Sequence, residues 1–220
     1  MKDNSQHLDS RAFGLAEWAR ATFSNAGIPE SAVLVPVSDD ASFRRYFRFN
    51  EGGAGLVFVD APPAKEDNQS FVKISSALCE AGLNCPEVKG CDYSLGYLAV
   101  TDLGDRLYLD ELIDNPSAMP SLYEDAIRAI LKFLPITCEL PPYDELKLKA
   151  EMGLFDEWFL EGQLDLKVNS AVAQMLEEVY ECLTNSALEQ PTVFVHRDFH
   201  CRNLMVEAAA NPGIIDFQDA

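Results

Sequence analysis

Short apolar runs separated by turn-forming residues dominate the N-terminal part of the chain. They contain the β-branched and aromatic residues typical of strands, and they cover residues 33–37, 43–49, 56–60, 87–92 and 97–102. Residues 9–26 and 68–81 instead repeat apolar positions with helical spacing and are followed by glycine, which predicts two helices. We therefore predict an α+β arrangement, in which a leading helix precedes a five-stranded antiparallel sheet with one helix inserted after its third strand.

The apolar spacing becomes helical from about residue 107 onward. It predicts three helices, over residues 121–134, 143–160 and 169–186. This change from strand-rich to helix-rich sequence near residue 104 predicts two lobes, residues 1–103 and residues 104–220.

Three further apolar runs lie near the C-terminal end, at residues 193–195, 204–206 and 214–215. We interpret them as short strands, the last two joined as a hairpin by a turn at residues 210–213. Such a hairpin would return Asp216 to the side of Asn203.

Residues 196–203 read H-R-D-x-x-x-x-N, and Asp216 and Phe217 follow the last apolar run. This order of residues is typical of kinase active sites. A carboxylate at Asp198 can orient an acceptor hydroxyl and take its proton, and Asn203 and Asp216 offer the hard oxygen ligands that Mg²⁺ prefers. We therefore predict a phosphoryl-transfer site that uses ATP and Mg²⁺.

Two other interpretations of this segment compete with a kinase site. Asp and Asn are common in loops simply because they favour turns. His196 and His200 are four residues apart, as in some zinc sites, but no Glu follows His196 and the stretch does not read as a helix. We expect His196 to pack and to form a hydrogen bond that holds the loop.

The phosphates of a nucleotide need polar groups from the strand-rich half. Residues 38–42 form a small polar loop between the first two strands, where a kinase covers the phosphates, but they lack a glycine-rich motif. The arginines that follow suit phosphate geometry, although a solvated strand face would also explain them. Residues 100–104 lie at the hinge between the predicted lobes, where backbone groups can meet an adenine edge. The predicted nucleotide-binding residues are Ser38, Ser42, Arg44, Arg45, Thr101 and Leu103.

The composition narrows the possible partners and the cellular compartment. The formal net charge of −19 argues against binding to nucleic acid or to an anionic membrane. No segment reads as a signal peptide or as a span of a bilayer, and the six cysteines contain no C-x-x-C pair. We expect a cytoplasmic protein with reduced thiols and with no membrane or nucleic-acid partner; the sequence indicates no oligomeric state.

Taken together, these motifs resemble those of the aminoglycoside phosphotransferase family, small-molecule kinases that share the protein-kinase fold. Four strings are similar to one branch, the bacterial anomeric kinases of N-acetylmuramate and N-acetylglucosamine in cell-wall recycling; they lie at residues 38–48, 60–63, 101–104 and 215–220. The resemblance implies a two-lobe kinase fold, with Asp198 as catalytic base and Asn203 and Asp216 as magnesium ligands. It also implies an amino sugar as acceptor and a sugar 1-phosphate as product.

Some features depart from the kinase pattern. Protein kinases carry a lysine on the third strand, where this chain has Asp60, so Arg44 or Arg45 is the candidate replacement. Gln218 occupies the position of the glycine that follows Asp-Phe in protein kinases. Family members continue with further helices, so the resemblance implies a helical lobe truncated after Ala220. Two alternatives stay open: a kinase for another small alcohol (an aminoglycoside, choline or a thiosugar), and a kinase-shaped binding module without catalysis.

Overall fold

The computed structural model describes residues 10–37, 43–53, 55–208 and 210–218. The chain divides into two compact units. Residues up to 138 and from 194 onward form the first unit, and residues 139–193 form the second. The lobe boundary predicted near residue 104 falls inside the first unit and stays a prediction.

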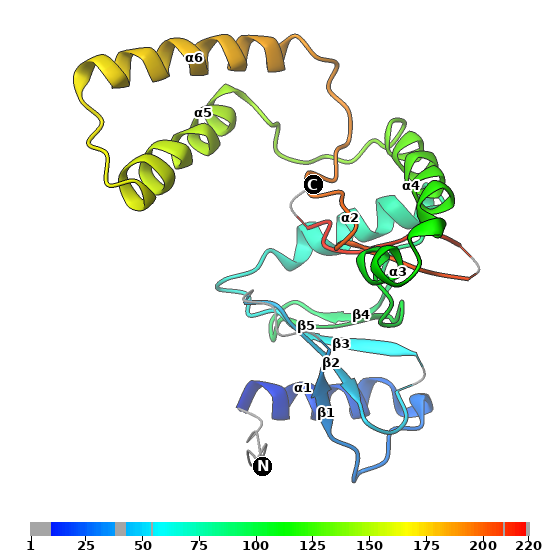
Figure 1. Cartoon of the computed structure of the whole chain (residues 1–220). Coiled ribbons are helices and arrows are strands. Elements are labelled where there is room, and N and C mark those ends of the chain that lie inside the picture. Colours follow the sequence, from blue (N-terminus) through cyan, green and yellow to red (C-terminus); the bar gives the residue numbers. More distant parts are fainter. Residues whose placement is uncertain (1–9, 38–42, 54, 209, 219–220) are drawn as a thin grey trace. The chain divides into compact units, whose positions relative to one another are not determined.

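A five-stranded antiparallel sheet forms the centre of the first unit, which confirms the predicted architecture (Figure 1). Its strands are β1 (Leu34–Pro36), β2 (Arg45–Phe49), β3 (Leu56–Asp60), β4 (Val88–Asp92) and β5 (Tyr97–Thr101). Their order across the sheet is β1-β2-β3-β5-β4, so β5 pairs with β3 and leaves β4 at the edge. Each neighbouring pair is antiparallel.

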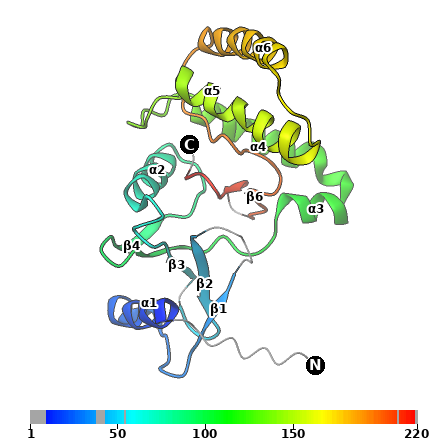
Figure 2. The same cartoon turned by 90° about the vertical axis from the view of Figure 1, so that its left-hand side faces the viewer.

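Helix α1 (Ser10–Thr22) covers one face of the sheet, and helix α2 (Asn68–Glu80) lies on the opposite side (Figures 1 and 2). Successive residues of a strand point to opposite faces. Phe58 accordingly joins the core beneath α1, whereas Val57 and Val59 are buried outside that core. Strand β3 is therefore covered on both faces and forms a rigid base for the segments above it.

The sequence explains where α2 begins and ends. Asp67 caps the helix, because its carboxylate accepts hydrogen bonds from the backbone N–H groups of Gln69 and Ser70 at 3.1 and 3.0 Å. Gly82 follows the end of the helix with a φ of +72°, a left-handed value that glycine adopts without strain.

The remainder of the first unit is helical and ends in a hairpin. Its elements are the 3₁₀ turns Ser24–Ala26 and Pro116–Ala118, helices α3 (Tyr108–Asp114) and α4 (Met119–Phe133), and strands β6 (Leu204–Met205) and β7 (Gly213–Ile214). Strands β6 and β7 pair antiparallel, which confirms the predicted hairpin. The prediction of a strand at residues 193–195 was wrong. That stretch packs through a single aromatic side chain, Phe194, whose ring centroid lies 5.9 Å from that of Phe133, rather than along a strand edge.

The second unit is a pair of helices. Its elements are α5 (Glu145–Leu154), a π-helical continuation (Phe155–Gln163) and α6 (Ser170–Leu188). Helix α6 lies against α5, where Lys149 Nζ is 3.5 Å from Glu177 Oε1. The apolar side chains at helical spacing in α5 and its continuation remain exposed, Leu146 to 79% and Trp158 to 68%. Among all the described residues, no helix is both long and apolar enough to cross a membrane.

A fully buried carboxylate ties α1 to the sheet. Asp60 has no exposed side-chain surface. Its Oδ1 accepts a hydrogen bond from Arg11 Nε at 2.7 Å, and its Oδ2 accepts one from Arg45 Nε at 3.1 Å. Each arginine keeps about a third of its side chain exposed, 36% for Arg11 and 37% for Arg45. Asp60 is thus a structural carboxylate held by two cations.

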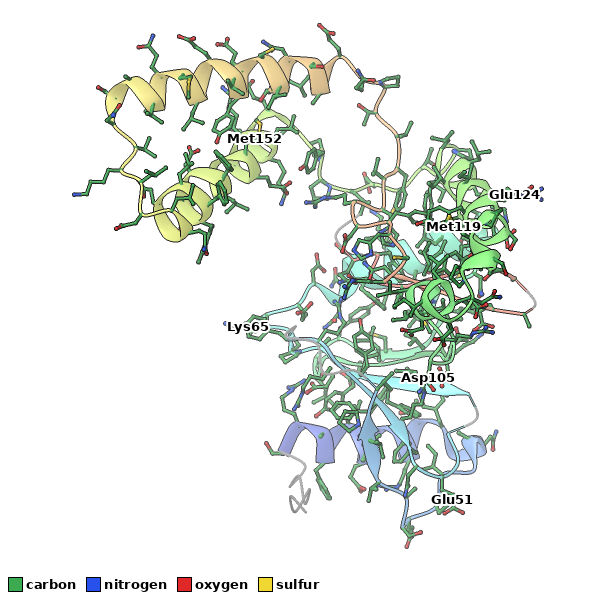
Figure 3. All side chains as sticks on the ribbon, in the orientation of Figure 1. Glu51, Lys65, Asp105, Met119, Glu124 and Met152 are labelled. Carbon is green, nitrogen blue, oxygen red and sulfur yellow. The ribbon has the colours of Figure 1, made fainter. Side chains whose placement is uncertain are left out.

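We expect Asp60→Asn to lower the free energy of unfolding by about 3 kcal/mol, because it leaves two guanidinium groups beside a neutral, buried amide. Urea unfolding followed by circular dichroism measures the change. Glu124→Gln is the matched control, since Glu124 points outward from α4 with its side chain 63% exposed (Figure 3). Its helical pair with Arg128 contributes only about 0.5 kcal/mol. Equal losses in the two variants would contradict a stabilising role for Asp60.

Candidate active site

The loop before β6 and the turn after β7 bring Asp198, Asn203 and Asp216 together. The side-chain amide of Asn203 lies between the two carboxylates: its Nδ2 donates to Asp198 Oδ2 at 3.0 Å and to Asp216 Oδ2 at 3.1 Å. The same nitrogen is 3.0 Å from the backbone carbonyl oxygen of Asp198. Asn203 is buried, whereas both carboxylates face solvent. One buried amide therefore holds two carboxylates that are both exposed at the surface.

Backbone hydrogen bonds lock the loop to the hairpin. The N–H of Ile215 donates to the carbonyl of Asn203 at 3.1 Å, immediately beyond the β6–β7 pairing. Arg197 and Asp216 have φ values of +70° and +61°, in the left-handed region. A non-glycine residue there costs on the order of 1–3 kcal/mol, and such strain persists only where the surrounding structure imposes it. Both strained positions lie at the candidate site, one beside Asp198 and one at Asp216 itself.

His196 holds the loop from beneath. Its Nε2 lies 3.0 Å from the carbonyl oxygen of Ile215, and its ring packs against those of Phe133 and Phe199, which also contact each other. Burial lowers the pKa of His196, because a charged imidazolium would lose its hydration there. The imidazole is therefore neutral near pH 7, and Nε2–H donates to the carbonyl. The geometry agrees with the packing role expected for His196.

Two further side chains orient the carboxylates, and our sequence analysis assigned neither of them this role. His200 Nε2 lies 3.0 Å from Asp198 Oδ1, and Gln218 Nε2 donates to Asp216 Oδ1 at 2.5 Å. Each carboxylate thus has one oxygen at Asn203 and the other at a second side chain. The sequence signal that could have revealed both contacts is that each partner lies two positions after its acid in a loop.

The donor set fits a divalent cation only if the amide takes part. Among the described residues, no group of three or more His, Cys, Asp or Glu side chains could hold a metal ion. Asn203 and Asp216 supply hard oxygen donors of the kind Mg²⁺ prefers. The amide nitrogen now faces the carboxylates, and a half-turn of the planar amide group exchanges it for the oxygen. The residues present therefore fit the predicted ion.

Arg44 connects the sheet to the candidate site. It is buried, and its guanidinium lies 3.1 Å from Glu66 and 4.6 Å from the ring centroid of Phe71. Phe71 stacks on Phe217, with 5.0 Å between ring centroids. Burial raises the pKa of Tyr46 to about 12, an increase that the Arg44 cation opposes and the Asp216 carboxylate favours. Tyr46 is thus close enough to both Arg44 and Asp216 for their charges to affect its pKa.

The other predicted nucleotide-binding residues lie in different surroundings. Ser38 and Ser42 fall outside the described residues. Arg45 is directed at Asp60, and Thr101 Oγ1 accepts a hydrogen bond from the backbone N–H of Glu87 at 2.9 Å. Their roles in binding a nucleotide stay predictions.

The segment of residues 100–104, for which the sequence predicts a hinge, is close to the hairpin at Leu103. A Cβ atom on Gly213 would lie 3.1 Å from Leu103 Cδ1 and 3.0 Å from Met205 Cβ, so glycine allows this close approach. Arg48 fixes this segment from the sheet, donating to both carboxylate oxygens of Asp102 at 2.6 Å. The segment, the hairpin and Asp216 therefore form one continuous structure.

The profile of the phosphotransferase enzyme family (APH) matches residues 33–220 of the chain. The chain therefore belongs to this family.

Individual relatives of the chain have narrower names than the family. The N-acetylmuramate/N-acetylglucosamine kinase of Pseudomonas aeruginosa is 43% identical over 191 residues, which are 86% of this chain and 56% of that protein. The kinase of the same name from Pseudomonas putida is 43% identical over 189 residues, 85% and 55% of the two chains. This chain thus spans little more than half the length of the curated relatives it matches.

A solved structure shares the fold. The streptomycin–ATP ternary complex of APH(2")-IIa superposes with a TM-score of 0.65 at 18% identity, over 96% of this chain and 71% of that chain. The kinase-like fold predicted from the motifs is confirmed.

The depressed pKa of His196 predicts a pH-dependent stability. The unfolded chain takes up a proton near the ordinary histidine pKa of 6.5, which the folded state resists. Stability is therefore complete above about pH 6.5 and falls as the pH decreases towards the folded pKa. His196→Gln keeps a donor for the Ile215 carbonyl but cannot titrate. We expect its urea midpoint to change less than that of the wild type between pH 7 and about pH 5.5.

His200→Gln serves as the comparison, because it removes an exposed histidine where His196→Gln removes a buried one. Parallel profiles for His196→Gln and the wild type would show that another group governs this pH range.

Proposed function

We propose that this protein is an ATP- and Mg²⁺-dependent kinase that phosphorylates N-acetylmuramate and N-acetylglucosamine at the anomeric hydroxyl, giving a sugar 1-phosphate. The observation that carries the proposal is the convergence of Asp198 and Asp216 on the single amide of Asn203. Kinship with two amino-sugar kinases at 43% identity supports the choice of acceptor. The proposal places the reaction in the cytoplasm, where peptidoglycan sugars are recycled.

Asp198 is the proposed catalytic base. Its carboxylate is solvent-facing, with 55% of the side chain exposed, so an acceptor hydroxyl can reach it. Asn203 and His200 hold its two oxygens, and this fixes the direction from which a proton can be accepted. Phosphoryl transfer depends mainly on positioning and charge, so a carboxylate with a fixed orientation is what the reaction needs.

Asn203 and Asp216 are the proposed magnesium ligands. The ion would neutralise phosphate charge next to the acceptor. Asp216 is held ready for this role by its left-handed backbone and by Gln218. Because Asn203 also contacts Asp198, the base and the ion site share one support.

Arg44 is the proposed source of positive charge in place of the third-strand lysine. It pairs with Glu66, at the entry to α2, and it reaches the Asp216 turn through Phe71 and Phe217. The planar guanidinium of an arginine offers donors whose geometry matches phosphate oxygens. Ser38, Ser42 and the backbone at Thr101 and Leu103 complete the proposed nucleotide site.

The test is an acceptor panel with Mg-ATP and the purified protein. We expect N-acetylmuramate and N-acetylglucosamine to yield sugar 1-phosphate, identified by ³¹P NMR, with Asp198→Asn binding ATP normally but losing about 10²-fold or more in kcat. Phosphorylation of an aminoglycoside, choline or a thiosugar in their place would overturn the acceptor assignment. Wild-type turnover in Asp198→Asn would overturn the assignment of the base.

Arg44 and Arg45 are adjacent, and their different partners predict different mutant phenotypes. We expect Arg44→Ala to raise the KM for ATP and to lower kcat/KM by about 100-fold, because a preorganised cation is lost. Arg45→Ala is the matched control, and it should mainly lower the melting temperature by releasing Asp60. Arg44→Lys, which keeps the charge, should recover part of the loss and thereby separates charge from packing. Unchanged ATP kinetics in both alanine variants would return Arg44 to a purely structural role.

A further inference from the structure

Two cysteines outside the candidate active site lie in contact with each other. Cys79 is in the last turn of α2, and Cys85 lies in the segment that leads into β4. Their sulfur atoms are 3.1 Å apart. All six cysteines of the chain are described and are free thiols, and no other two of their sulfurs are in contact. From this geometry we propose that Cys79 and Cys85 form a redox-modification site, which closes to an intramolecular disulfide in reaction with a small disulfide such as oxidised glutathione.

The turn after α2 creates this proximity. Gly82 takes a left-handed conformation and donates its N–H to the carbonyl of Cys79 at 3.0 Å, and the N–H of Leu83 reaches back to Leu78 at 3.1 Å. The chain therefore reverses direction, and the two sulfurs meet although the cysteines are six positions apart along the chain. A disulfide bond is about 2.05 Å long, so closure requires the sulfurs to approach by only about 1 Å.

The surroundings set the order of the chemical steps. Cys79 is half-buried, whereas Cys85 is 4% exposed. An external disulfide therefore meets Cys79 first. The Cys79 thiolate attacks one sulfur of the small disulfide and releases one small thiolate, leaving a mixed disulfide on the protein. The Cys85 thiolate then attacks Cys79 Sγ and displaces the second small thiolate.

The atoms and electrons of this exchange balance without a further reactant. The two protein thiols lose two protons and two electrons as the Sγ–Sγ bond forms. The small disulfide gains both electrons, its sulfur–sulfur bond breaks, and the two protons complete two small thiols. Burial raises the pKa of Cys85, so the second step is expected to be the slower one.

The site is connected to the hairpin that precedes Asp216. The carbonyl of Asn84 accepts a hydrogen bond from the N–H of Ile214 at 2.7 Å, and Asn84 Nδ2 donates to the carbonyl of Ala210 at 2.8 Å. Cys85 is the next residue, and its Sγ lies 3.6 Å from the carbonyl oxygen of Ser75 in α2. A disulfide at this point would tie α2 covalently to the segment on which the hairpin rests. The inference itself does not depend on the proposed kinase activity.

Peptide mapping tests the proposal directly. The purified protein is treated with oxidised glutathione, blocked with iodoacetamide and digested with a protease specific for glutamate. Glu80 lies between the two cysteines, so cleavage there leaves their peptides joined only if the disulfide has formed. We expect the joined pair after oxidation, and its loss after treatment with dithiothreitol. Two separate peptides that both carry the carbamidomethyl group from iodoacetamide would overturn the proposal. A disulfide between either cysteine and another cysteine of the chain would also overturn it.

Single substitutions sharpen the test. Cys85→Ala should trap glutathione on Cys79 as a stable mixed disulfide, because the displacing thiol is gone. Cys91→Ser is the matched control, since Cys91 is also half-buried but contacts no second cysteine, and it should still form the joined pair. A stable glutathione adduct on Cys79 in the wild-type protein would show that Cys85 cannot complete the second step, and this would also overturn the proposal.

Discussion

The candidate site depends on one buried amide. Asp198 and Asp216 would repel each other if they met without a donor between them, and the Asn203 Nδ2 atom provides that donor for both. The backbone of Asn203 is held in place because its carbonyl accepts the N–H of Ile215, so the loop and the hairpin cannot separate without breaking this hydrogen bond. The left-handed backbone at Asp216 is tolerated for the same reason, since these bonds leave the turn no relaxed alternative.

The support extends from this amide to the sheet through side-chain contacts. Phe217 follows Asp216 and stacks on Phe71 of α2. The Phe71 ring in turn contacts the guanidinium of Arg44. Strand β3, buried on both faces, and the Asp60 ion pairs make the sheet a rigid support for these contacts. Because every step is a packed or hydrogen-bonded contact within the first unit, a shift of α2 would be transmitted to the turn at Asp216.

The sequence predicted the sheet and the convergent acids well, for definite physical reasons. Strand ends were correct to within two residues, because glycine and polar residues interrupt each apolar run. The meeting of Asn203 with Asp216 followed from a hairpin short enough to allow no other return path. The predictions that failed were those that depended on which segments or side chains pair with each other. A three-residue apolar run at 193–195 looked like a strand, but local pattern does not reveal whether a neighbouring strand is available to pair with it.

The two adjacent arginines show this limit most clearly. Successive residues of an extended chain point to opposite sides. Arg45 therefore reaches Asp60 on the neighbouring strand, its register partner, while Arg44 turns to Glu66 and Phe71. An acid at residue 60 could not hold phosphate, but it neutralises Arg45 and leaves Arg44 as the cation directed toward α2. Arg44, the residue before β2, therefore faces the entry to α2, where Glu66 is its partner.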